Sequence, residues 1–332
     1  MKKNILLSVA ASFLIAGSSV YAASLTEHHT ADAKVKTDQT IHSFWALSHS
    51  PDHLTKKQLD YFKSVGLLKT HRLIEKEIKQ AKEHASKAPK EVTQALQSTV
   101  KAMAYLEKNE TSKAEEQLKK ATKLFDEAMK KDPSLKLVPI DTDIDLVAHK
   151  VTLDEAKQIK EDALKTLKEN KPQETIALLE TLKNQMTITT TSLPMDLYPV
   201  TTKKALELLK KHDKKEKVLA TLADGLNTLV TVEVVIPLPL LVAQDAAEEA
   251  SKLSKKKPKE AAKLLNLAQT QLNLAEYEGY LSEKGKIYHT LHREIKSLQD
   301  KIGKGNILEK DFDKAKEAFK KMFDAIHSGS KK

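Results

Sequence analysis

The feature that most constrains the fold is a short Lys-rich turn that recurs four times between apolar stretches. Each turn has seven residues and follows a leucine. The four turns are EKNETSK (107–113), KENKPQE (168–174), KKHDKKE (210–216) and SKKKPKE (254–260). Leu164 and Leu167 before the second turn, and Ile176 and Leu179 after it, have the three- and four-residue spacing of amphipathic helices. The pattern predicts four helix–turn–helix units.

Three segments between these units are predicted to be extended: 135–151, which alternates, and 186–200 and 230–242, which are β-branched before a proline-containing exit. β-Branched residues favour strands, and three such strands would pair into a small sheet covered by the hairpins. We interpret Leu229–Ile236 as a buried strand followed by an extended exit that contains Pro237 and Pro239. The predicted fold class is mainly α, with repeated helical hairpins and a small β-sheet as a minor α+β component.

Residues 1–22 are predicted to form a signal peptide. Lys2 and Lys3 precede a short apolar stretch, Ile5–Ile15, and residues 20–22 offer the small-x-Ala pattern that signal peptidase cleaves. The apolar stretch is shorter than the roughly 18 residues that span a bilayer. We therefore expect export, a periplasmic location and no transmembrane span in the mature chain. An uncleaved amphipathic anchor is the alternative.

Composition argues against several kinds of chemistry. The 332 residues include 8 glycines and no cysteine, which removes thiol nucleophiles and thiolate metal sites and leaves little room for glycine-rich phosphate loops. No nucleophile elbow or Ser/His/Asp arrangement can be singled out. We expect a non-enzymatic protein with no catalytic residues, no cofactor and no metal site. An unrecognised hydrolase is the enzymatic alternative.

The basic residues are almost all lysines. The formal net charge is +10, yet Arg72 and Arg293 are the only arginines. Proteins that read nucleic acids favour arginine for base contacts, and those that bind single strands interleave aromatic residues with basic ones. The lysines here alternate with glutamates at helical spacing, which is typical of a solvated helix face. We expect no nucleic-acid partner, and an anionic surface such as lipid or cell-wall polymer is the alternative to a merely solvated face.

Two kinds of motif resemble a known family. The hairpin turns contain KPKEA at Lys257–Ala261 and, more loosely, KPQE at Lys171–Glu174, and the segment Ile236–Leu240 reads IPLPL after a β-branched run. In these features the sequence over about Val92–Tyr288 resembles the YfdX family of exported bacterial proteins. The resemblance implies a periplasmic, mostly helical protein with a small β component that self-associates and is linked to acid stress and antibiotic tolerance. It implies no established reaction and assigns no functional residues.

The chain is accordingly expected to have four parts. These are the signal peptide (1–22), a His-rich N-terminal arm with a first helix (23–90), a YfdX-like helical-hairpin domain with short strands (91–290) and a C-terminal helical extension (291–332). Phe44 and Trp45 form an apolar patch in the arm, and we expect them to dock it onto the core or a partner subunit.

Histidines are the candidate pH-sensing residues. Seven of the 12 lie in the first 84 residues. His49 with His53 and His289 with His292 have spacings that place each pair on one helix face. Two imidazoles are not a metal site, and no third ligand is visible beside either pair. Because free histidine titrates near pH 6.5, mild acid would add charge and favour opening or dissociation; scattered solvent-exposed histidines are the alternative.

A third pattern is the triplet Asp141, Asp143 and Asp145. An EF-hand loop would need Gly and Glu at later positions, where this chain has Leu146 and Thr152. Period two instead places the carboxylates on one solvated face of a strand, with Ile140, Ile144 and Leu146 on the other, and a weak cation site is the alternative.

Together these features predict a non-enzymatic periplasmic protein that binds and protects under acid or antibiotic stress. It would bind envelope proteins or small molecules in apolar grooves between hairpins, with histidine-dependent pH switching and assembly into a homo-oligomer. The alternative is a structural scaffold for one defined envelope partner.

Overall fold

The computed structural model describes residues 70–329 except 86, 150 and 283–284. The predicted signal peptide, Phe44 and Trp45 of the arm, and the first histidine pair, His49 and His53, lie outside the described residues. The helices of the first half are α4 (Thr70–Ala85), α5 (Lys90–Glu107), α6 (Thr111–Lys131), α7 (Leu153–Lys168) and α8 (Pro172–Glu180). Those of the second half are α9 (Tyr198–Lys210), α10 (Lys215–Leu226), α11 (Leu238–Leu253), α12 (Pro258–Tyr277), α13 (Lys286–Gly303), the 3-10 helix η1 (Glu309–Phe312) and α14 (Asp313–Gly329).

The four predicted hairpins are confirmed as α5–α6, α7–α8, α9–α10 and α11–α12. Three of their turns contain one residue in the left-handed region, with φ of 60° at Asn109, 59° at Asn170 and 54° at His212. Each lies three residues after the leucine that precedes its turn. Asparagine tolerates this conformation because its short polar side chain hydrogen-bonds locally. The three hairpins therefore reverse direction by the same backbone device.

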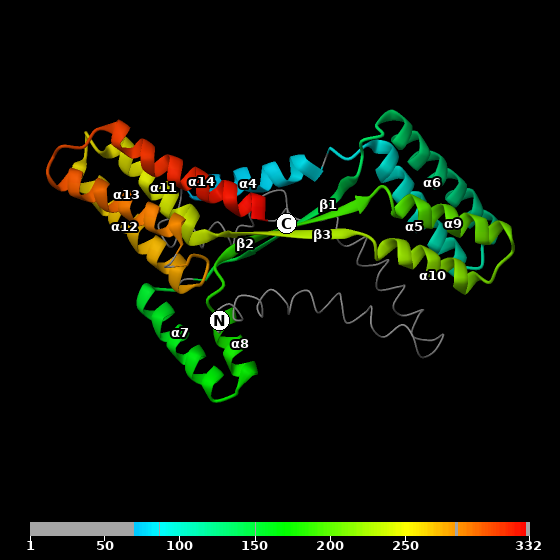
Figure 1. The fold of residues 1–332 in the computed structure, drawn as a ribbon, viewed down its shortest axis with the longest axis horizontal. Coiled ribbons are helices and arrows are strands. Elements are labelled where there is room, and N and C mark those ends of the chain that lie inside the picture. The colour runs from blue at the N-terminus through cyan, green and yellow to red at the C-terminus, as the bar shows by residue number, and fades with distance from the viewer. Residues whose placement is uncertain (1–69, 86, 150, 283–284, 330–332) are drawn as a thin grey trace.

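The hairpins assemble into two lobes at opposite ends of a sheet (Figure 1). The first, the four-helix lobe, consists of α5, α6, α9 and α10. The second, the C-terminal lobe, consists of α11, α12, α13, η1 and α14, with α4 alongside. The hairpin α7–α8 projects separately and packs on α12 through α7. The predicted boundary at residue 290 falls within α13, whose Leu291 and Ile295 share one core with α11 and α12.

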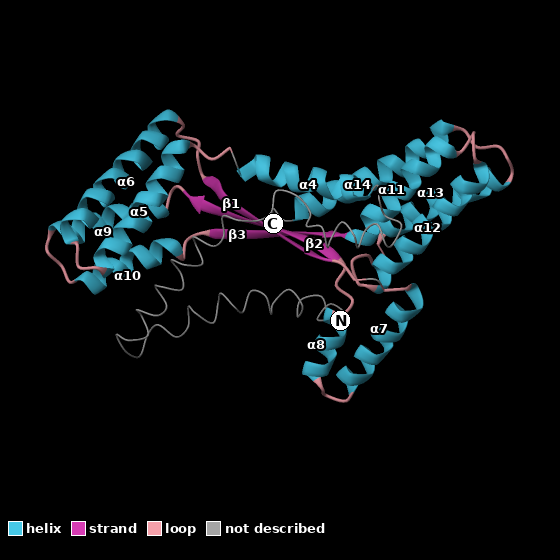
Figure 2. Ribbon diagram, turned by 180° about the vertical axis from the view of Figure 1, so that it is seen from behind, coloured by secondary structure: helices cyan, strands magenta, loops and turns pink. Residues whose placement is uncertain are grey.

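Two polar contacts join helix α4 to the C-terminal lobe. The Thr70 hydroxyl donates a hydrogen bond to Asp245 of α11 at 3.2 Å. His327 of α14 pairs with Glu77 of α4, with 3.1 Å between Nε2 and Oε2. Between these points α4 lies along the sheet beside β1 (Figure 2).

The three predicted strands are confirmed as β1 (Leu137–Val147), β2 (Gln185–Pro194) and β3 (Val230–Pro237). They form an antiparallel sheet in the order β1-β2-β3. Residue pairs such as Ile144 with Ile188 and Ile188 with Val234 define the register. Because β2 leaves α8 and enters α9, and β3 leaves α10 and enters α11, the strands connect the two lobes.

At the end near the four-helix lobe, the sheet buries the face that carries Leu193 of β2. Leu193 pairs with Val138 of β1, and both pack against Phe125 of α6 and Tyr198 of α9. The rings of Phe125 and Tyr198 meet edge to face with centroids 5.8 Å apart.

At the other end the sheet buries the opposite face. Met186, Ile188 and Ile236 pack there against Ile74 and Ile78 of α4, together with apolar residues of α11 and α14. Met186 and Leu193 are seven residues apart on one strand, so their side chains point to opposite faces. The sheet thus gives one face to each lobe.

Two expectations for the strands are wrong in detail. Strand β3 is not buried along its length, because Val230, Thr231 and Glu233 are exposed and burial begins only at Ile236. The exit is not extended: Pro237 precedes α11 and Pro239 lies in its first turn. A first turn tolerates proline because its N–H groups have no partner within the helix.

The aspartate triplet follows the predicted alternation, with one exception. Asp141, Asp143 and Asp145 are paired with Thr191, Thr189 and Thr187 on one face of the sheet. Ile144 and Leu146 pack on the other face, beside α4. Ile140 does not join them, because the register shifts between Pro139 and Asp141 and Ile140 packs with the core of the four-helix lobe.

The turn conformation at Asn170 gives a direct test of the hairpin geometry. Replacing Asn170 with valine should lower the free energy of unfolding by about 1–2 kcal/mol, because a β-branched residue is strained at positive φ. Asn170→Gly should leave it unchanged or raise it. Urea midpoints at constant m-value measure the difference. Equal losses in both variants would show that the backbone conformation is not the cause.

Candidate functional site

The second predicted histidine pair lies on α13, but its two members differ in environment. His289 is exposed, whereas His292 is partly buried. Nδ1 of His292 lies 2.5 Å from the amide nitrogen of Gln269 on α12, and its ring lies 4.0 Å from that of Tyr288. Nε2 of His292 is buried and has no hydrogen-bond partner among the described residues.

Burial lowers the pKa of His292, and the charge of nearby His289 acts in the same direction. A group whose pKa is depressed on folding destabilises the fold when it becomes protonated. Protonating His292 in mild acid therefore opposes the contact between α12 and α13. His289 and His292 remain a prediction for pH sensing, now with a defined neighbour in Gln269.

His327, which the sequence pattern did not single out, responds in the other direction. Its hydrogen bond with Glu77 is the main reason that its pKa is raised. Protonation of His327 thus strengthens the contact of α14 with α4, and this stabilisation is lost as the pH rises through the raised pKa. Its partner lies 250 residues away in the sequence, so spacing gave no signal for the pair.

No group of three histidine or acidic residues in the described part of the chain is arranged to hold a metal ion. The aspartates of β1 are spread along the strand opposite threonines.

A partly buried polar cluster joins the start of β2 to the end of α12. It consists of Asn184, Gln185, Glu278 and Tyr280, which we call the junction cluster. The Tyr280 hydroxyl accepts a hydrogen bond from the Asn184 backbone N–H at 2.9 Å and donates one to the Gln185 side chain at 2.8 Å. The Asn184 amide donates to Oε1 of Glu278 at 3.3 Å.

The junction cluster also reaches the end of β3. The backbone carbonyl of Asn184 accepts a hydrogen bond from the N–H of Leu238, the first residue of α11, at 2.9 Å. Asn184 therefore bonds to α11, to Glu278 after α12 and to Tyr280. It joins the sheet to the C-terminal lobe by hydrogen bonds, in addition to the apolar packing of Met186, Ile188 and Ile236.

Glu278 is the titratable group of the junction cluster. Burial raises its pKa to about 8, and the hydrogen bond from Asn184 offsets only part of this shift. Oε2 of Glu278 is buried with no hydrogen-bond partner among the described residues. Burial also raises the pKa of Tyr280. The cluster holds a proton at neutral pH and releases it in mild alkali.

Sequence reasoning missed most of this cluster. The sequence patterns gave Asn184, Gln185 and Glu278 no role. The sequence offered one sign of the cluster. Two amide side chains, Asn184 and Gln185, directly precede the β-branched segment 186–200, which is predicted to lie in a sheet covered by the hairpins.

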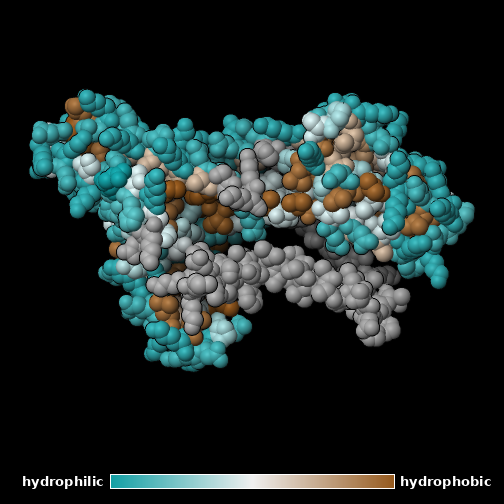
Figure 3. Space-filling view, viewed as in Figure 1, coloured by the Kyte–Doolittle hydropathy of each residue, from teal (hydrophilic) through white to brown (hydrophobic). Residues whose placement is uncertain are grey.

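Exposed aliphatic side chains gather at the opposite end of the sheet. We call Leu137, Leu197, Val200 and Val230 the sheet-end patch; all four are exposed, Val200 most at 62%. Leu137 and Val230 pair with Pro194 and Ser192 at the end of β2, and the Leu197 N–H bonds to the carbonyl of Pro194. Figure 3 shows apolar surface where the sheet meets the four-helix lobe.

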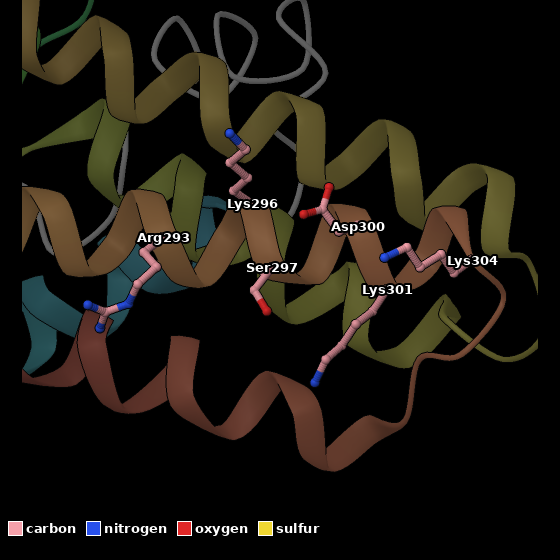
Figure 4. Close-up of a pocket in the computed structure, with 6 residues that line it drawn as sticks. All are labelled: Arg293, Lys296, Ser297, Asp300, Lys301 and Lys304. Atoms are coloured by element: carbon pink, nitrogen blue, oxygen red, sulfur yellow. The ribbon is translucent and has the colours of Figure 1, made fainter.

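Two surface hollows are polar rather than apolar. One, of about 380 Å³, is lined by Arg293, Lys296, Ser297, Asp300 and Lys301 of α13 and by Lys304, which directly follows the helix (Figure 4). The other lies mostly on α6 and includes Lys119, Lys123 and Lys130. Neither is the apolar groove between hairpins that the sequence predicts. The helices in the described ranges include none that is long and apolar enough to cross a membrane.

Comparison with known proteins identifies one family. Residues 95–235 match the family model of the YfdX protein, a range that ends directly before the IPLPL segment. Among solved structures the chain is similar to Salmonella Typhi YfdX, at 17% sequence identity and a TM-score of 0.30, over 45% of this chain and 91% of that one. No curated protein matches the sequence.

The pKa of Glu278 predicts a specific pH dependence. Its raised folded-state pKa contributes stability that is full below about pH 4.5, the value expected in the unfolded chain, and is lost as the pH rises through about 8. Between about pH 6.5 and pH 9 this loss is about 2 kcal/mol. Glu278→Gln should remove it, whereas Glu116→Gln at an exposed site on α6 should not.

Denaturant unfolding of the three proteins at both pH values measures this loss. An unchanged pH dependence in Glu278→Gln would show that the carboxyl group does not titrate in this range.

Proposed function

Because residues 95–235 match the YfdX family model, we propose that this chain is a non-enzymatic exported protein that binds and protects proteins or small molecules of the bacterial envelope under acid or antibiotic stress. The observation that carries the proposal is the sheet-end patch. The exported location rests on the signal-peptide pattern of residues 1–22.

The sheet-end patch has the properties of a binding surface for apolar groups. Its side chains are held on regular secondary structure, because Leu137 and Val230 begin strands and Val200 lies in the first turn of α9. Contiguous apolar surface bordered by polar residues marks interaction sites in soluble proteins. Exposed lysines follow or precede its members in the sequence, with Lys136 before Leu137 and Lys203 and Lys204 after Val200.

The arrangement favours binding on a surface over chemistry in a cavity. The two hollows lie on lysine-rich helix faces, and Glu278 is enclosed within the junction cluster. A shallow apolar surface accepts clients of different shape, which suits a protective role.

Acid would modulate this binding through the contacts around the C-terminal lobe. Protonation of His292 opposes the packing of α12 on α13, whereas protonation of His327 strengthens the packing of α14 on α4. The proposed response to acid is thus a loosening centred on α13, with α4 kept in place over the sheet. Self-association into a homo-oligomer belongs to the same proposal and is implied by the family resemblance.

Substitutions in the patch test the proposal. The mature protein should suppress light scattering by an aggregating periplasmic protein, and Leu197→Lys with Val200→Lys should abolish most of this effect, because charge disfavours apolar contact. The matched control is Leu164→Lys with Leu167→Lys, which replaces two exposed leucines of α7 outside the patch. Scattering is measured at about pH 7.5 and pH 5, on either side of the ordinary histidine pKa.

Suppression that the patch variant lacks and the α7 variant retains would support the proposal. Equal suppression by all three proteins would contradict it. Binding of a single envelope protein without any effect on scattering would favour a fixed-partner scaffold instead.

A further inference from the structure

Helix α13 presents a row of basic side chains on its outer face. Lys286, Arg293, Lys296 and Lys304, which we call the basic stripe, are all exposed. Their spacings of seven, three and eight residues keep them on one side of the helix. The opposite side is fixed in the C-terminal lobe through four buried residues: Leu291, Ile295, Leu298 and Ile302.

The charge of the basic stripe is largely uncompensated. Within the described ranges no carboxylate lies within 4.0 Å of the ammonium groups of Lys286, Lys296 or Lys304, and only Arg293 has an acidic partner, Glu294 at 3.1 Å. Helix α6 differs, because its Lys119 and Lys123 pair with glutamates one turn away. Ion pairs with glutamates one turn away thus recur along α6, whereas three of the four members of the basic stripe have no such pair among the described residues.

The α13 hollow provides donors for an anionic group. Figure 4 shows Arg293, Ser297 and Lys301 directed toward α14, whereas Lys296 and Asp300 are directed away from α14. Lys301 is paired with Asp311 at 2.8 Å. The donors here are the guanidinium of Arg293, the ammonium groups of Lys296 and Lys304 and the hydroxyl of Ser297. Phosphate oxygens accept hydrogen bonds from such groups.

We propose that the basic stripe docks the protein onto the surface of an anionic phospholipid bilayer. The 18-residue helix is about 27 Å long, so its basic side chains are spread over a length that several headgroups of a planar surface can meet at once. Its apolar side is occupied by the lobe core, so the helix stays outside the hydrocarbon region and contact is electrostatic. A predominance of lysine, with one arginine and no aromatic residue in the row, does not suit recognition of nucleic acids.

Vesicle co-sedimentation of the full mature chain tests the proposal. The protein should bind vesicles that contain phosphatidylglycerol at low salt, should not bind vesicles of phosphatidylcholine alone, and should be released at about 1 M salt, where charges are screened beyond about 3 Å. Each basic group near an anionic surface adds roughly a fivefold gain in partitioning. Lys296→Glu with Lys304→Glu should therefore lower partitioning by about 25-fold or more.

The matched control is Lys120→Glu with Lys130→Glu, which makes the same change in net charge at exposed positions of α6. It should bind nearly as well as the unaltered protein, and circular dichroism checks that both variants are folded. Equal losses of vesicle binding in the two variants would show that binding depends on net charge alone. That result would overturn the assignment of the lipid-binding surface to α13. Binding to soluble polyphosphate without binding to vesicles would make the partner a polymer and also overturn it.

Discussion

The structure depends on a sheet of three strands that buries a different face at each end. An antiparallel sheet commonly covers one face and leaves the other in water. Here the face that carries Leu193 packs against the four-helix lobe, and the face that carries Met186 packs against α4 and the C-terminal lobe. Neither lobe has this part of its core without the sheet, so the position of β2 determines where both lobes lie.

The two ends of the sheet carry different groups: a titratable cluster at one end and an exposed apolar patch at the other. One end of β2 begins at the junction cluster, where Asn184 bonds to Tyr280, Glu278 and Leu238. The other end reaches the sheet-end patch, where aliphatic side chains face solvent. Ionisation of Glu278 thus acts on the attachment of the sheet, and proposed client binding takes place beyond its far end. The basic stripe lies on a third surface, so docking on lipid would leave the patch accessible.

Much of the fold could be predicted from the sequence because local patterns determine it. The Lys-rich turns mark the hairpins, and Asn109 and Asn170 fit their left-handed positions. Alternation marks the first strand, and β-branched runs mark the other two. The sequence could not predict which face of each strand is buried. Apolar and polar residues alternate in the same way whichever lobe covers the strand. The start of β3 is exposed because each lobe covers only one face of the sheet, at its own end. The local sequence of β3 does not indicate which of its residues are left uncovered.

The candidate site was less predictable for the same reason. Glu278 is perturbed because the junction cluster encloses it, and its partner Asn184 is 94 residues away. His327 and Glu77 also meet only in the folded chain. The predicted pair His289 and His292 does share α13, yet packing against Gln269 and Tyr288 makes only His292 partly buried.

Hydrogen exchange on two core variants tests the central claim most directly. Met186→Ala and Leu193→Ala each remove a fully buried side chain, at a cost of about 2–5 kcal/mol. If the sheet gives one face to each lobe, Met186→Ala should reduce amide protection first in α4 and α14, and Leu193→Ala first in α5 and α6, while β2 loses protection in both. Loss of protection in the same lobe for both variants would contradict the account.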